Sequence, residues 1–267
     1  ASGTANKSAR RIENRFRKMN ASVSRSLSGL AGPLAAAFSI QGAKQLIDTS
    51  TRIENALKVA GLSGQELTDV YDQLFAAAQR NAAPVESLVE LYSRAALVQK
   101  ELGVSQQELI GFTEKVSVAL RVSGKSAAES SGALLQLSQA LGSGVVRAEE
   151  FNSILEGALP IAQAAAAGLE EAGGSVSKLR QLVIDGKVSS ETFFRAFEAG
   201  SVILDQKVSK ATLTLDQRMT VLKNTFVKAA EKIDDATGAS AFFGKALSDF
   251  ADDINTVVTE IQDLIKW

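Results

Sequence analysis

Apolar residues recur at helical spacing along most of this chain, and glycines divide the pattern into short runs. Between residues 45 and 200, a glycine followed by a polar residue separates one apolar run from the next. Glycine ends a helix readily because it can adopt the left-handed conformation, and the polar residue after it can cap the next helix. We therefore expect helical hairpins with connections of about two to four residues. The expected helices cover residues 45–60, 63–81, 84–101, 105–122, 126–141, 147–169, 175–185 and 189–200.

The starts of three expected helices share one capping signal. In each, a serine precedes a glutamate by three positions, a spacing at which each side chain can bond the other's backbone N–H group. We expect a capping box at each of these starts. The pairs are Ser63 with Glu66, Ser105 with Glu108, and Ser126 with Glu129.

Two prolines mark further boundaries. Pro84 stands just inside the start of the helix expected over 84–101, where its missing N–H costs nothing. Pro160 lies inside the pattern of 147–169, where a proline removes a backbone hydrogen bond. We expect Pro160 to break or kink that helix.

Two phrases within residues 134–200 match each other. Gly144–Phe151 (GVVRAEEF) and Gly186–Phe193 (GKVSSETF) share Gly, Val, Glu and Phe at identical internal spacing. Each phrase follows an apolar helical run and opens another, so each is predicted to be a helix–turn–helix joint whose Phe anchors the new helix. Neither phrase has the composition of a catalytic site.

Both ends of the chain carry longer amphipathic patterns. In residues 7–30 the apolar positions follow steps of three and four, as in a coiled-coil seam. Residues 202–235 have no strong breaker and predict a long helix, with steps near 3.5 from Leu215 onwards. A second long helix is expected over 240–266, and the pattern runs to the last residue, which favours a chain that continues in a longer protein.

The predicted fold is therefore all-α, a compact helical-hairpin module flanked by extended amphipathic helices. Residues 1–44 form a basic amphipathic helix and an apolar segment, 45–200 the module, and 201–267 long helices that self-associate. Only three prolines and an aromatic content of 6% support this class, because a β core would favour more Tyr, Trp, Val, Ile and Thr.

Residues 27–43 contain no charged side chain. The segment is interrupted by Gly29, Gly32 and Pro33, and it is shorter than the ~20 residues that a membrane-spanning helix needs. Helix–helix packing is the favoured interpretation. Contact with a host membrane after a conformational change stays open as the alternative.

Composition excludes several kinds of chemistry. The chain has no His and no Cys, so His-based triads, Cys nucleophiles, disulfides and the usual zinc ligand sets are ruled out. The net charge of −1 hides a strongly basic N-terminal region, in which only Glu13 opposes Lys7, Arg10, Arg11, Arg15, Arg17, Lys18, Arg25 and Lys44.

The favoured interpretation of this basic helix is packing on a neighbouring helix or on copies of itself. Contact with an acidic protein wall or with DNA is the alternative. No aromatic residues are interleaved for base stacking, which argues against sequence-specific recognition.

Adjacent carboxylates are the strongest remaining catalytic candidates. They could supply an acid–base pair for glycoside cleavage, although such pairs are common on solvated helix faces. A peptidoglycan-cleaving enzyme would need a buried Glu with a raised pKa, and no Glu lies in an unmistakably apolar segment. The pairs are Glu149/Glu150, Asp234/Asp235 and Asp252/Asp253.

Residues 185–191 briefly resemble half of a calcium loop. Gln181, Val183 and Thr192 would then occupy positions that need oxygen-rich ligands, so we interpret the segment as a turn. We accordingly predict no catalytic, cofactor-binding or metal-binding residues, and a protein that is not an enzyme.

An ordered series of phrases carries a family resemblance. Over roughly residues 30–215 the chain resembles the N-terminal domain of tail tape-measure proteins from long-tailed bacteriophages and prophages. It departs from the family at Ala148, where members tend to have a second Gly, and in a longer route to Pro160. The phrases are LYSRAA (91–96), ELGVSQQEL (101–109), TEKVSVALR (113–121), QLSQALGSG (136–144), EEFNS (149–153) and GKVSS (186–190).

The resemblance implies a structural role in the virion. Family members lie in the tail tube lumen as a few parallel helical copies, with a trimer among the expected arrangements. They template tube polymerisation, set tail length, and leave the tube ahead of the DNA. The implied partners are the tube protein, tail assembly chaperones and distal tail proteins, with assembly in the host cytoplasm. A membrane-active helical protein that inserts residues 27–43 into the host envelope is the competing hypothesis.

Overall fold

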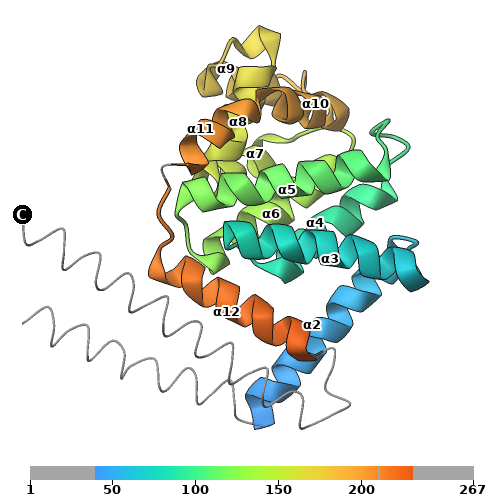
Figure 1. Ribbon diagram of the computed structural model, residues 1–267. Coiled ribbons are helices and arrows are strands. Elements are labelled where there is room, and N and C mark those ends of the chain that lie inside the picture. The colour runs from blue at the N-terminus through green and yellow to red at the C-terminus, as the bar shows by residue number, and fades with distance from the viewer. Residues whose placement is uncertain (1–39, 210, 231–267) are drawn as a thin grey trace, which may run out of the picture. The chain divides into compact units, whose positions relative to one another are not determined.

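The computed structural model describes residues 40–209 and 211–230, and within them the protein is all-α, as predicted (Figure 1). An isolated β-bridge is the only extended pairing within these residues. The helices are α2 (Ile40–Val59), α3 (Gly64–Asn81), α4 (Val85–Leu97), α5 (Gln106–Ser123), α6 (Ala127–Gly142), α7 (Ala148–Gly157), α8 (Leu159–Gly168), the 3-10 helix η1 (Glu170–Ala172), α9 (Val176–Ile184), α10 (Ser190–Gly200), α11 (Val202–Val208) and α12 (Leu215–Ala230).

The chain divides by its internal contacts into two units, Ala1–Asp48 and Thr49–Trp267. All packing described below lies within the second unit. The basic helix and most of the apolar segment predicted over residues 7–43, and the helix predicted over 240–266, lie outside the described residues. The division of the chain at 44 and 200 remains a prediction about which parts fold independently.

Two of the three predicted capping boxes are present. Ser105 Oγ accepts the N–H of Glu108 at 3.2 Å, and the Glu108 carboxylate accepts the N–H of Ser105 at 2.7 Å. Ser126 and Glu129 make the same pair of bonds at the start of α6.

The capping box predicted at Ser63 is wrong. Ser63 does precede α3, but its side chain makes no capping hydrogen bond. Gly64, the first residue of the helix, has a φ of +54°, in the left-handed region. A capping box needs right-handed residues immediately after the serine, so that the N–H groups of the first turn face its hydroxyl.

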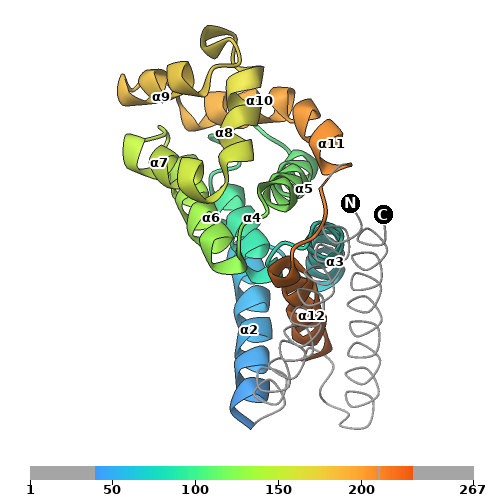
Figure 2. The same cartoon turned by 90° about the vertical axis from the view of Figure 1, so that its left-hand side faces the viewer.

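Both prolines lie at helix boundaries. Pro84 is the residue immediately before α4, one position outside the helix rather than just inside it, and Pro160 lies in the first turn of α8 and breaks the predicted helix as expected. The pattern expected over 147–169 is accordingly divided after Gly157. A Cβ on Gly157 would lie 2.8 Å from the carbonyl oxygen of Glu129, so this glycine lets α7 approach α6 closely (Figure 2).

The long helix expected over 202–235 is divided as well, into α11 and α12. Thr214 and Gln217 form a capping box that starts α12: Thr214 Oγ1 accepts the Gln217 N–H at 3.2 Å, and Gln217 Oε1 accepts the Thr214 N–H at 3.0 Å. Thr and Gln three residues apart are a helix-start signal that is also visible in the sequence, so a boundary at Thr214 is consistent with local capping. Both α11 and α12 pack on the preceding helices, α11 against α5 and α8 and α12 against α3 and α6.

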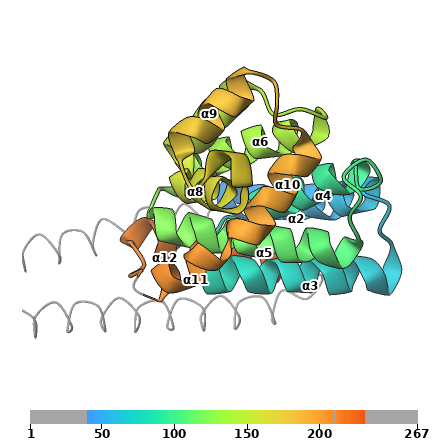
Figure 3. The same cartoon turned by 90° about the horizontal axis from the view of Figure 1, so that it is seen from above.

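Helix α8 packs against five other helices, α5, α7, α9, α10 and α11 (Figure 3). Its closest neighbour is α10, and both helices carry an alanine followed four residues later by a glycine at the crossing. A Cβ on Gly168 would lie 1.9 Å from the Ala196 carbonyl oxygen, and one on Gly200 would lie 1.8 Å from that of Ala164. The two backbones are therefore in direct contact, which only glycine permits.

Stacked phenylalanines join α10 to α5. The rings of Phe112 and Phe194 are 4.4 Å apart and stacked, and Phe197 meets Phe112 edge-on at 5.0 Å. All three side chains are fully buried, so this contact forms the apolar core between the two helices.

Candidate functional site

The two matched phrases of the sequence lie against each other. The N–H of Val146 donates to the carbonyl of Val188 at 3.0 Å, and the N–H of Ser190 donates to the carbonyl of Gly144 at 3.1 Å. These bonds form an antiparallel bridge between Val145 and Ser189. The sequence predicted two separate joints, whereas the structure makes them the two halves of one contact.

The residues shared by the two phrases have matching roles in this contact. Gly144 and Gly186 have φ values of +80° and +67°, which turn the chain out of α6 and α9. The rings of Phe151 and Phe193 meet edge-on with their centroids 6.4 Å apart, and both are fully buried. Each Phe anchors the helix that its phrase opens, as predicted.

The polar residues of the joints are used as helix caps. Ser189 Oγ accepts the N–H of Thr192 at 3.0 Å, and Ser190 Oγ donates to the carbonyl of Ala140 in α6. Glu150 is buried, and its Oε2 accepts the Arg147 N–H at 2.9 Å. The structure therefore assigns Glu150 a role in starting α7.

Of the other carboxylate candidates, Glu149 is exposed, while Asp234/Asp235 and Asp252/Asp253 lie outside the described residues.

Two carboxylates elsewhere have clearly shifted pKa values. Hydrogen bonds from Arg195 and from the backbone and hydroxyl of Ser105 lower the pKa of Glu108 to about 2. Hydrogen bonds from Ser126 and Lys125 lower the pKa of Glu129 to about 2. A general acid in glycoside cleavage needs a shift in the opposite direction. Both groups serve as helix caps.

Two kinds of feature are absent from the described part of the chain. Within 40–209 and 211–230, no three His, Cys, Asp or Glu side chains are grouped so that they could hold a metal ion. In the same part of the chain, no helix is both long and apolar enough to cross a membrane. Most of the candidate membrane segment, residues 27–39, lies outside these ranges.

A groove of about 440 Å³ lies between α2 and α4. Its apolar lining includes Val59 and Leu97, which are 68% and 59% exposed. The charged side chains at its edge pair with each other: Arg52 contacts Glu86 at 2.8 Å, and Arg94 contacts Glu90 at 2.7 Å. The groove is thus an apolar surface feature whose charged groups are already engaged.

The sequence of most of the described chain matches a known protein family. A family model described as tape measure protein matches residues 41–235, which includes both joints and all of α3–α12. The chain belongs to the tape measure protein family. No curated protein and no solved structure matches it. Family membership gives the chain a structural role in a phage tail, and it agrees with joints that use their polar residues to build helices.

Proposed function

We propose that this tape measure protein templates polymerisation of the tail tube, sets the length of the tail, and leaves the tube ahead of the DNA. The observation that carries the proposal is the family match over residues 41–235. The partners in this role are the lumen of the tube protein, the tail assembly chaperones and the distal tail proteins. Assembly takes place in the host cytoplasm, and the mature protein lies in the tube lumen.

The described helices suggest that different parts of the chain contribute differently to tail length. A single helix extends ~1.5 Å per residue, whereas hairpins fold back and add little length. Helices α3–α11 have at most 18 residues each and pack on one another, so they are a poor ruler. We infer that length is set by extended helices outside the packed module, which associate as a few parallel copies through seams such as that of residues 12–30.

Tail length after insertion or deletion tests this division. Whole heptads inserted into residues 240–266 should lengthen tails by ~1.5 Å per residue, measured by electron microscopy of the phage. An insertion of the same length in the turn between α4 and α5 should abolish assembly or leave tail length unchanged. Tails that lengthen equally in both cases would contradict the proposal that only the extended helices set length. Tails that never change length would contradict the proposal that this protein sets tail length.

The basic N-terminal residues are proposed to contact an acidic tube wall or DNA during assembly. Such contacts release counterions, so the affinity should fall steeply as salt is raised. Binding of the full chain to tube protein and to DNA, measured over a salt series, would distinguish the two partners. Binding that does not change with salt would count against the proposal.

We also propose that the chain has no lytic activity of its own. A zymogram on peptidoglycan with the purified chain is the direct test, and a clear band would overturn this statement.

A further inference from the structure

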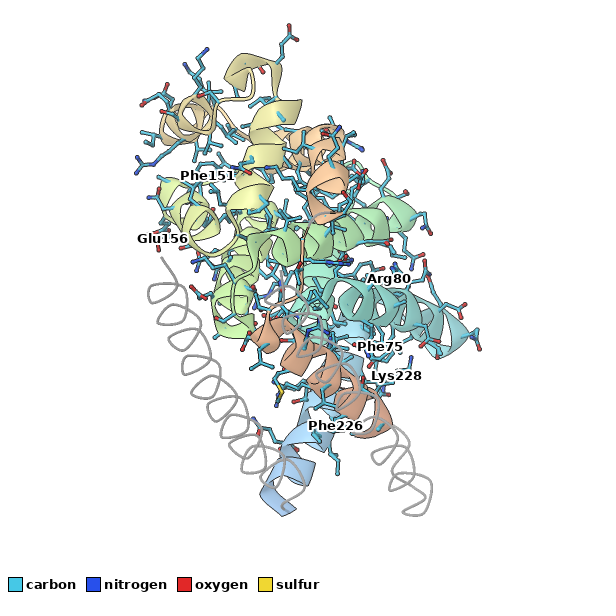
Figure 4. The ribbon with its side chains drawn as sticks, turned by 60° about the vertical axis from the view of Figure 1, so that its left-hand side comes forward. Phe75, Arg80, Phe151, Glu156, Phe226 and Lys228 are labelled. Atoms are coloured by element: carbon cyan, nitrogen blue, oxygen red, sulfur yellow. The ribbon has the colours of Figure 1, made fainter. Side chains whose placement is uncertain are left out.

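Helix α12 runs antiparallel alongside α3. Gln79 Nε2 donates to Thr225 Oγ1 at 2.7 Å, and Lys228 pairs with Asp72 nearer the start of α3. Lys228 Nζ also lies 4.4 Å from the centre of the Phe75 ring, and both side chains are labelled in Figure 4. These contacts place α3 on one side of α12.

The ends of α4, α5 and α6 lie against the same half of α12. Asn224 Oδ1 accepts the N–H of Val85, the first residue of α4, at 3.0 Å. Gln217 Nε2 donates to a carbonyl in the last turn of α5 at 3.2 Å. Asp216 Oδ2 accepts the N–H of Ala127, the first residue of α6, at 2.8 Å.

The opposite side of α12 is buried as well. Leu222 and Phe226 each lie two residues from Asn224, a rotation of about 200° round the helix, so they face away from α4, α5 and α6. Their side chains are nevertheless only 4% and 3% exposed. A helix that packs on one side leaves its other face open to water. Burial on this side therefore requires a further apolar layer.

The buried residues on this side belong to a strict heptad pattern, which we call the α12 seam. Its members follow steps of four, three, four, three and four, as at positions a and d of a coiled coil. The last member lies just beyond the described residues. The members are Leu215, Met219, Leu222, Phe226, Ala229 and Ile233.

A second heptad pattern, the C-terminal seam, follows after a break at Thr237-Gly238. Its members lie outside the described residues, and their steps are again four, three, four, three and four. If the chain reverses direction at the break, the two seams match residue for residue, from Ile233 opposite Phe243 to Leu215 opposite Ile261. The members are Phe243, Leu247, Phe250, Ile254, Val257 and Ile261.

Charge also distinguishes the two amphipathic segments that could cover the α12 seam. Helix α12 is basic, with three Lys or Arg side chains against one Asp. Residues 240–266 carry five acidic side chains against two basic ones, whereas residues 7–30 carry seven basic side chains against one acidic. Complementary charge therefore favours residues 240–266 as the partner of α12.

We propose that residues 240–266 form a helix that folds back on α12 and covers its seam, so that the two helices make an antiparallel hairpin. The short connection holds this segment at an effective concentration on the order of millimolar, which favours it over a second copy of the chain. The proposal concerns the free chain and does not rest on the proposed role in tail length. A helix that lies on α12 in the free chain would have to leave it in order to extend within a tail.

Cross-linking of introduced cysteines in the full chain tests the proposal. The chain has no Cys, so each introduced pair is unique. Met219→Cys with Val257→Cys places two thiols opposite each other, and a short bis-maleimide should join them within one chain. Met219→Cys with Phe243→Cys is the matched control. Phe243 lies two heptads away, about 20 Å along the helix, so this pair should cross-link at least about tenfold more slowly.

Denaturing gels and mass spectrometry would follow both reactions. Equal rates for the two pairs, or no cross-link in either, would overturn the proposal, because the seams would not lie in the proposed register. Cross-links that join two chains would overturn it too, and would assign the cover of the α12 seam to a second copy.

Labelling of a single cysteine provides the second arm. Met219→Cys should react with a maleimide at least about tenfold faster when Phe250→Asp is added, because a charged side chain is costly to bury in the seam. Asp252→Asn, two residues away and off the seam, is the control and should leave the rate unchanged. Equal rates in all three chains would show that this segment does not cover α12. If Phe250→Asp fails to fold, the cross-linking arm decides the question, because it needs no buried charge.

Discussion

At the scale of single residues, the crossing of α8 and α10 requires glycine at two positions, Gly168 and Gly200, where a hydrogen stands in place of a Cβ. Gly168 and Gly200 each face a carbonyl oxygen of the partner helix at a distance that excludes any Cβ. A glycine inside a helix normally costs stability, because it has more freedom to lose on folding. Here that cost is offset by a backbone contact that brings the buried alanines of α8 against α10.

Gly200→Ala should therefore destabilise the protein by about 1–3 kcal/mol or more, because the two helices must move apart. Gly132→Ala is the matched control: Gly132 lies within α6 with no atom within 4 Å of its Cβ position, so alanine there should stabilise by about 0.5–1 kcal/mol. Urea unfolding monitored by circular dichroism would measure both. Changes of the same sign in the two variants would contradict this account.

The matched phenylalanines make a second prediction at this scale. Phe193→Ala should cost about 3–5 kcal/mol, because the ring is fully buried and leaves a cavity. Val202→Ala, at a side chain that is 65% exposed, should change the free energy of unfolding little. If Phe193→Ala had normal stability but failed to assemble tails, its ring would belong to an interface with a partner.

At the scale of elements, local capping starts α5 and α6, and long-range contacts complete them. Ser105 and Ser126 cap within their own helices, whereas Asp216 caps α6 and Gln217 caps α5 from α12. Arg195 of α10 also contacts Glu108, the glutamate of a capping box, at 2.7 Å. A helix start can thus be specified locally and still be tied to a distant element.

These glutamates predict a pH dependence of stability. Their pKa values are lowered to about 2 in the folded protein from 4.5, so the unfolded chain binds protons more readily as the pH falls. The stability that they contribute is present above pH 4.5 and is lost as the pH falls towards 2. Glu108→Gln with Glu129→Gln keeps residues that can cap but cannot titrate.

The midpoint of urea unfolding should therefore fall less for this double variant than for the natural chain between pH 5 and pH 2.5. Parallel losses of stability in the two proteins would show that these carboxylates do not contribute.

At the scale of the whole molecule, α11 and α12 pack on the helices that precede them. A chain ending at residue 200 would lack the side chains that complete the ends of α4, α5 and α6. It would also expose the faces of α5 and α8 that α11 covers. We therefore expect a chain that ends at residue 200 to be less stable than one that includes α11 and α12.

A truncation series tests this extent. Residues 41–235 should fold cooperatively, and residues 41–200 should melt at a clearly lower temperature or fail to unfold cooperatively, as measured by calorimetry. Limited proteolysis of the full chain should yield a resistant fragment that ends beyond Ala230. A stable fragment that ends near residue 200 would contradict the packing of α11 and α12 as a contribution to stability.

The sequence by itself determined the helical class, most helix boundaries and the family. These depend on local signals: the spacing of apolar residues, glycines that can turn left-handed, and serine–glutamate pairs three residues apart. Local signals do not decide every boundary. The left-handed Gly64 removes the geometry of the capping box predicted at Ser63, and the Thr214–Gln217 box divides the helix that apolar spacing predicts over 202–235.

Only the tertiary structure decided what the matched phrases and α12 contact. Gly144–Phe151 and Gly186–Phe193 are alike in sequence, but repetition alone does not say that the two segments pair with each other. The use of Asn224 as a cap for α4 is equally invisible, because its partner lies 139 residues away in the chain. Capping signals act over three or four residues, whereas such contacts exist only once the packing of α8 on α10 and of α12 on α3 has brought the segments together.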